Sequence, residues 1–143
     1  MTADTDVEID RPEVIAEVLA AFHRYERALT EADLAVLTEL FWDDPRTVRY
    51  GLDDRQRGAE QIAAWRRDHP SVPPGRRLRE TTVLAVDDRM AVVNTLFHYP
   101  AADAGHGGPC PTPEEGRQSQ TWVRFAHGWR IVAAHVSQTR HPD

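Results

Sequence analysis

Arginine, histidine and tyrosine side chains at four positions are the residues of this sequence best suited to bind and convert a small anion. Arg117 and His135 lie in the last two predicted strands, Arg46 follows a proline, and Tyr25 lies in the first predicted helix. A guanidinium group binds a carboxylate through two parallel hydrogen bonds. An imidazole exchanges protons near neutral pH, and a buried phenol hydroxyl needs a hydrogen-bond partner. This set predicts acid–base chemistry on a carboxylated molecule.

The segment 116–138 predicts how some of these side chains meet. It reads as two strands joined by a three-residue loop that ends at Gly128, which accepts a positive φ. That loop places Phe125 opposite Trp129, so the predicted register pairs Ser119 with His135 and Arg117 with Ser137. Because side chains alternate between the two faces of a strand, every second residue shares one surface. That surface carries Arg117, Ser119, Thr121, Val123, Phe125, Trp129, Ile131, Ala133, His135 and Ser137. Apolar groups with a few converging polar ones are typical of a small-molecule pocket.

We therefore assign roles within that predicted pocket. The candidate catalytic residues are His135 and Tyr25; the candidate substrate ligands are Arg117, Arg46, Ser119, Ser137, Asn94 and Trp129. Three of these residues have structural alternatives. Arg117 has a salt bridge to a local glutamate, His135 has a hydrogen bond to a neighbouring serine, and Tyr25 has a place in the core with a protein partner. Arg46 and Arg49 are three residues apart, so alternation places them on opposite faces. We expect Arg46 to reach the pocket mouth.

The composition excludes several classes of function. The chain has 143 residues, with 17 basic and 23 acidic side chains and a net charge of -6. The chain has no long run of like charges, which would have predicted binding to nucleic acid or to a membrane. No metal-ligand spacing, phosphate-binding glycine loop or dinucleotide fingerprint is present, so we expect no metal or cofactor. The N-terminal residues lack the apolar segment of a signal peptide, which predicts a cytoplasmic protein.

Helical and strand patterns follow one another along the chain. After a loose tail (1–9), a single domain (10–140) begins with a helix from Asp10, the expected N-cap, to about Thr30. A short helix capped by Asp33 and a third helix over 59–69 follow, with a strand over 46–50 between them. Strands over 78–86 and 90–99 and a long loop over 100–115 precede the final strand pair. Helices followed by strands predict an α+β fold, with three N-terminal helices packed on a curved antiparallel sheet.

Three blocks carry a resemblance to a known family: FHRYERAL (22–29), LFWDDPRTVRYG (40–51), and GRQSQTWVRF with GWRIVAAHVS (116–137). In these blocks the chain resembles the AtzH-like family of the SnoaL-like, nuclear-transport-factor-2-like superfamily. The resemblance implies a cystatin-like cone and an enzyme of ureide catabolism, which converts 1,3-dicarboxyurea to allophanate with loss of carbon dioxide. A non-catalytic accessory subunit of an amidohydrolase and a SnoaL-like isomerase or hydratase are the alternatives.

The opposite surface of the last two strands predicts an interface. It carries Gln118, Gln120, Trp122, Val132, Ala134 and Val136. A patch of an aromatic ring, amides and small apolar groups suits self-association, and the resemblance implies dimers formed through the convex sheet face. We therefore expect a homodimer whose subunits each bind a small anionic molecule.

Overall fold

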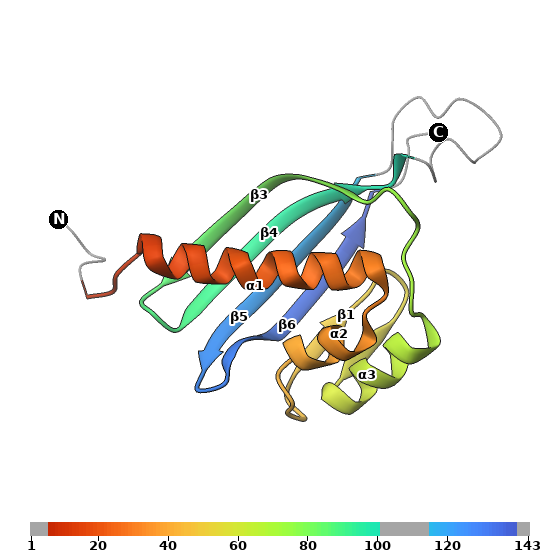
Figure 1. Ribbon diagram of the computed structural model, residues 1–143, viewed down its shortest axis with the longest axis horizontal. Helices are drawn as coiled ribbons and strands as arrows, with labels where there is room; N and C mark the ends of the chain where they lie inside the picture. Colours follow the sequence, from red (N-terminus) through yellow and green to blue (C-terminus); the bar gives the residue numbers. More distant parts are fainter. Residues whose placement is uncertain (1–5, 101–114, 140–143) are drawn as a thin grey trace.

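The computed structural model describes residues 6–100 and 115–139, which form helices on a six-stranded sheet. The elements in chain order are α1 (Pro12–Glu31), α2 (Leu34–Leu40), β1 (Val48–Tyr50), β2 (Arg55–Arg57), α3 (Ala59–Asp68), β3 (Arg77–Val86), β4 (Met90–His98), β5 (Gly116–Phe125) and β6 (Gly128–Gln138) (Figure 1). The predicted helices and the later run of strands are confirmed. β2 was not predicted, because its sequence, Arg-Gln-Arg, has no apolar residue.

The strands lie in the order β2-β1-β6-β5-β4-β3. Neighbours pair antiparallel except for β1 and β6, which are parallel and place Arg49 beside Ala134. β2 pairs antiparallel with β1 through a short turn, so that Arg49 lies opposite Gln56. This arrangement brings residues 48–57 to the sheet edge next to β6.

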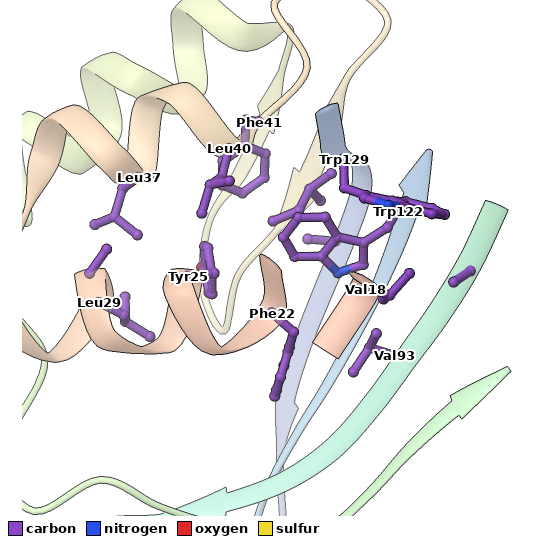
Figure 2. Packing of buried hydrophobic residues seen from close by; sticks show 14 of the residues in the cluster. Val18, Phe22, Tyr25, Leu29, Leu37, Leu40, Phe41, Val93, Trp122 and Trp129 are labelled. Carbon is purple, nitrogen blue, oxygen red and sulfur yellow. The ribbon is translucent and has the colours of Figure 1, made fainter. Parts of the chain in front are cut away.

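Helix α1 crosses one face of the curved sheet, while α2 and α3 lie at one end of it (Figure 1). Its buried residues recur at the helical period and include Val14, Val18, Phe22, Tyr25 and Leu29. They pack with Val93, Trp122 and Ile131 from the sheet (Figure 2). We call the face covered by α1 the inner face, and the opposite face the outer face.

The predicted helix caps have different outcomes. Asp33 is the N-cap of α2, and its carboxylate accepts a hydrogen bond from the Val36 N–H at 3.2 Å, as predicted. The prediction that Asp10 caps α1 is wrong. Asp10 has a φ of 57°, and its carboxylate instead accepts from the Ala85 N–H, which attaches this segment to β3. Residues 1–5 of the predicted tail and 101–114 of the predicted loop lie outside the described residues.

The turn between β5 and β6 is one residue shorter than predicted. Gly128, at φ 118°, is already part of β6 and pairs with Phe125. Beyond the turn the register shifts: Trp122 pairs with Ile131 but Thr121 pairs with Ala133. Val132 is therefore left over as a β-bulge. From there the pairing is as predicted, with Ser119 opposite His135 and Arg117 opposite Ser137.

The bulge reverses the predicted faces of the sheet. Ile131 before it and Ala134 after it both point inward, so the residues that alternate with Ala134 point outward. Arg117, Ser119, His135 and Ser137 consequently lie exposed on the outer face. The predicted dimer residues Gln118, Gln120 and Trp122 are 4%, 1% and 0% exposed on the inner face. Both face assignments made from the sequence were wrong.

Candidate functional site

A cavity of about 680 Å³ lies between α1, α3, the segment 69–76 and the inner face of the sheet. This volume lies within the range of small-molecule sites. Aromatic rings, amides and arginines line it, including Tyr25, Arg49, Trp65, Arg66, Arg76, Phe97, Tyr99, Gln118 and Gln120. The cavity therefore combines apolar walls with buried cationic groups.

Arg49 projects inward from β1 because its neighbours Val48 and Tyr50 occupy the opposite side of that strand. Its Nη1 donates to Asp54 Oδ2 at 2.6 Å and to Gln56 Oε1 at 2.8 Å. Its Cζ lies 4.1 Å from the centroid of the Trp65 ring, in cation–π contact. Among the residues that the structure describes, only Nη1 has hydrogen-bond partners, so Nη2 and Nε of this cavity-lining residue have none there.

Arg66 lies on the buried side of α3, one turn after Ile62, and is 9% exposed. Its Nη1 donates to the His69 carbonyl at 3.2 Å, and its Cζ lies 4.8 Å from the Trp65 ring centroid. No carboxylate within residues 6–100 or 115–139 forms an ion pair with it. Burial lowers the pKa of Arg66, and the charge of Arg49 acts in the same direction. A buried guanidinium without a counter-ion favours binding of an anion.

Tyr25 is 4% exposed and reaches the cavity from α1. Its hydroxyl forms no hydrogen bond with any residue that the structure describes. Since none of the fully buried side-chain nitrogen or oxygen atoms described lacks a partner, this hydroxyl must be accessible from the cavity. Burial raises the pKa of Tyr25, although the charge of Arg66 acts against this shift. The Tyr25 hydroxyl is therefore a neutral hydrogen-bond donor near the guanidinium of Arg66.

The third arginine of the cavity, Arg76, is fully paired. Its Nε and Nη2 donate to the two Glu26 oxygens at 2.8 and 3.2 Å, and its Nη1 donates to the Tyr99 hydroxyl at 2.9 Å. Gln118 joins the network by accepting from Arg76 and donating to Glu26. Burial is the largest single effect and lowers the pKa of Arg76, but the hydrogen bonds and charge of Glu26, together with Tyr99, outweigh it, so the pKa of Arg76 is raised. This network fastens the segment 69–76 to α1 and β5.

The three cationic groups thus differ in their charge balance. Arg49 is paired with Asp54 and Arg76 with Glu26, whereas Arg66 has no acidic partner among the residues described. A carboxylate entering the cavity would therefore find one uncompensated positive charge, beside an open phenol hydroxyl.

The AtzH-like family model matches residues 7–142, which include every element that builds this cavity. The chain belongs to the AtzH-like family. No curated protein sequence matches this AtzH-like chain.

Solved structures agree with this family assignment. A cystatin-like fold protein from Burkholderia xenovorans is 44% identical, with 95% of this chain and 99% of that chain covered and a TM-score of 0.84. A protein of unknown function from Pectobacterium atrosepticum is also 44% identical, with 98% and 99% covered and a TM-score of 0.81. A nuclear-transport-factor-2-like superfamily protein from Salmonella enterica is 24% identical, with 92% and 94% covered and a TM-score of 0.67. The predicted nuclear-transport-factor-2-like, cystatin-like fold is confirmed.

Of the predicted site residues in this AtzH-like protein, the cavity includes Tyr25 alone. The Arg117 side chain is 55% exposed and pairs with Glu115, with 3.1 Å between Arg117 Nε and Glu115 Oε2. His135 is exposed and makes an edge contact with the Tyr50 ring, at 5.6 Å between centroids. The prediction that Arg117 and His135 share a pocket is wrong. Arg117 alternates with the inward-facing Gln118 on β5, and His135 follows the bulge on β6, so both lie on the outer face.

The other predicted ligands also lie outside the cavity. The Arg46 side chain is 76% exposed and pairs with Asp44 at 2.8 Å. Ser119 and Asn94 bond to each other on the outer face, where Ser137 is also exposed. Trp129 is buried, but its indole N–H donates to Glu17 at 2.9 Å. Of the predicted dimer residues, Gln118, Gln120 and Val136 instead line the cavity.

Sequence patterns could have identified the arginines that do line the cavity. Arg66 follows Ile62 by four residues and Trp65 by one, so a helical projection places it beside the apolar stripe of α3. A lone cation on an apolar helix face indicates a buried charge. For Arg49, the strand alternation already required one of Arg46 and Arg49 to face inward, and the wrong one was chosen.

Two further findings bear on function. Among the residues described, no group of three or more histidine, cysteine, aspartate or glutamate side chains is arranged to hold a metal ion. Within the same residues, no helix has the length and apolar character needed to cross a membrane.

Proposed function

We propose that this AtzH-like protein is a cytoplasmic, cofactor-free enzyme that acts on a small carboxylated ureide. Its substrate would be an anion of the 1,3-dicarboxyurea type, which loses carbon dioxide by decarboxylation or hydrolysis. Arg66 binds a carboxylate of the substrate, and Tyr25 donates a hydrogen bond to it or to the reacting nitrogen. Membership of the AtzH-like family supports this class of substrate.

One observation carries the proposal: a buried guanidinium without an acidic partner and a phenol hydroxyl without a hydrogen bond open into one cavity. Both statements hold for the residues described, and both groups are at most 9% exposed. An unpaired charge in such a position is costly unless a ligand compensates it. A carboxylate does so through two parallel hydrogen bonds. Nη2 and Nε of Arg49 add further donors on the same side of the cavity.

The proposed chemical step breaks the bond between nitrogen and the carboxylate carbon. The electron pair of that bond stays on nitrogen, the carboxylate leaves as carbon dioxide, and nitrogen takes a proton from the Tyr25 hydroxyl. Water then returns a proton to the tyrosine and leaves as hydroxide, which the solvent buffer neutralises. Because burial raises the pKa of Tyr25, the hydroxyl keeps its proton until nitrogen becomes basic. The rings of Trp65 and Phe97 exclude water around the reacting group.

Substitution of the two proposed groups tests the function. With 1,3-dicarboxyurea as substrate and carbon dioxide release as the readout, Arg66→Gln should reduce kcat/KM about 10- to 100-fold, because charge-assisted hydrogen bonds contribute about 1.5–3 kcal/mol. Tyr25→Phe should reduce kcat by about 100-fold or more if the hydroxyl is the proton donor. Arg117→Gln, on the outer face, is the matched control and should leave turnover unchanged. Equal turnover by wild type and Arg66→Gln would reject the proposal.

The same assay separates this proposal from the two alternatives. A non-catalytic accessory subunit would bind carboxylates in an Arg66-dependent way without releasing carbon dioxide. An isomerase or hydratase of the SnoaL-like kind would need a base in the cavity. Asp54 lines the cavity but is paired with Arg49, and His69 lines it with its ring stacked on Trp65. The charge of Arg66, which has no acidic partner among the residues described, favours an anion-binding enzyme.

A further inference from the structure

Asp54 lies in the turn between β1 and β2 and makes a closed set of contacts with two neighbours. Its Oδ2 accepts from Arg49 Nη1 at 2.6 Å and from Gln56 Nε2 at 2.9 Å. Gln56 Oε1 in turn accepts from the same Arg49 Nη1 at 2.8 Å. The Arg49 side chain is 9% exposed and that of Asp54 is 24% exposed, so the ion pair is at the inner end of the turn. Asp54 therefore acts as a resident anion on one guanidinium of the cavity.

Gly51 is what allows the Asp54 carboxylate to occupy this position. The Gly51 N–H donates to the Asp54 carbonyl at 2.8 Å and closes the turn. A Cβ atom at residue 51 would collide with both carboxylate oxygens of Asp54. The carboxylate thus lies over the glycine, in space that any other residue would fill, and is directed at Arg49.

Arg66 provides the contrast. It contacts the same Trp65 ring as Arg49 and has no carboxylate partner in the part of the chain that the structure describes. The cavity consequently offers two arginines with free N–H groups, of which one has its charge neutralised within the protein and one does not.

We propose that Asp54 is a specificity-determining residue that restricts the cavity to one ion-paired carboxylate. The inference rests on the proposed function and extends it to the two ends of the substrate. Arg66 would bind the carboxylate that is retained in the product. The second carboxylate of a dicarboxylated urea would lie beside Arg49, whose charge Asp54 already neutralises. This carboxylate would be the one that leaves. Ion pairing stabilises a carboxylate but not neutral carbon dioxide, so an unpaired leaving group lowers the barrier.

Calorimetric binding of two unreactive probes tests the inference. Glutarate and its monoamide glutaramate have nearly the same shape and differ by one negative charge. In Asp54→Asn, Arg49 becomes free to pair with the second carboxylate, so glutarate should bind about tenfold more tightly, a gain typical of one charge-assisted hydrogen bond. The affinity for glutaramate should change by less than about twofold, since its second end carries no charge.

Two further variants make the test specific. Asp53→Asn removes the same charge from the adjacent residue, which also lines the cavity but has no ion pair with any described residue. This variant should leave the ratio of the two affinities unchanged. Gly51→Ala keeps the Asp54 charge but displaces its carboxylate from Arg49. It should reproduce the gain for glutarate, and it does not depend on the stability of the asparagine variant.

The outcomes separate this inference from the proposed function. A selective gain for glutarate in Asp54→Asn and Gly51→Ala, absent in Asp53→Asn, supports it. An unchanged ratio in both variants, with binding still lost in Arg66→Gln, overturns the role of Asp54 and leaves the proposed function standing. Binding of neither probe by wild type or by any variant overturns both.

Discussion

The guanidinium groups of Arg49 and Arg66 share one aromatic partner, since their Cζ atoms lie 4.1 and 4.8 Å from the centroid of the Trp65 ring. Two like charges that are this close to one ring repel each other, and the negative face of the indole reduces that repulsion. His69 also stacks on the ring, at 4.3 Å between centroids. Trp65 therefore contacts both guanidinium groups and His69.

Replacing Trp65 should weaken anion binding. A cation–π contact contributes about 0.5–2 kcal/mol, so Trp65→Leu should raise the dissociation constant for glutaramate about tenfold. Trp65→Phe keeps an aromatic face and should lose less than half of that free energy. Titration calorimetry on both variants checks the difference, with melting curves to verify folding. Equal losses for leucine and phenylalanine would show that the ring only fills space.

Tyr25 should keep its proton above the ordinary pKa of a tyrosine. Its pKa is raised above the ordinary value of 10.0 by burial, so the folded protein keeps this proton in solutions where the unfolded chain releases it. Stability is then fully present below pH 10.0 and falls as the pH rises above it, because the native state binds more protons than the unfolded state. The difference between ultraviolet titrations of wild type and Tyr25→Phe isolates the tyrosinate signal of Tyr25, which should appear above pH 10.0. A Tyr25 signal that is complete by pH 10.0 would contradict the assigned burial effect.

The final hairpin illustrates what the sequence could and could not predict. The pairs Ser119 with His135 and Arg117 with Ser137 were predicted correctly, because the extra residue on β6 compensates for a turn that is one residue shorter than predicted. The face that these pairs occupy depends on a single extra residue, Val132. A bulge has no clear signature in a run such as Ile-Val-Ala-Ala, and a one-residue slip moves every side chain to the other face. The predicted pocket and the predicted interface were exchanged for this reason.

The cavity residues also show what can and cannot be predicted from the sequence. Tyr25 was placed correctly because the helical period of α1 is strong and α1 packs along its whole length. To predict the position of Arg66, a helical projection of the short helix α3 would have had to include charged residues as well as apolar ones. The pairing of Arg49 with Asp54 depends on β2 and its turn, whose polar sequence gives no strand pattern. These contacts between distant elements are set by tertiary structure.

The buried ion pair between Glu26 and Arg76 should be important for stability. Both side chains are at most 11% exposed. Glu26→Gln would leave the Arg76 charge buried without its partner, which costs about 3–5 kcal/mol. Removing both charges in Glu26→Gln, Arg76→Met should recover much of that loss. Urea unfolding measures these free energies.

The exposed pair of Arg24 and Glu39 is the matched control for that experiment. It has a similar separation of 2.7 Å, but its side chains are 45% and 44% exposed. Glu39→Gln should therefore cost only about 0–1 kcal/mol. A loss from Glu26→Gln no larger than that from Glu39→Gln would contradict the structural role given to the cavity network.

The outer face of the sheet is where we expect the homodimer to form, with residues other than those first predicted. Tyr50, Leu84 and Met90 are 47%, 47% and 40% exposed there or at its margin, and Ala133 is exposed near its centre on β6. Because two copies of one face meet in a symmetric dimer, a large charge at the centre faces its own copy. Ala133→Arg should therefore yield monomers in light scattering, whereas Ala20→Arg on the exposed side of α1 should not. A dimer that persists in Ala133→Arg would exclude this face as the interface.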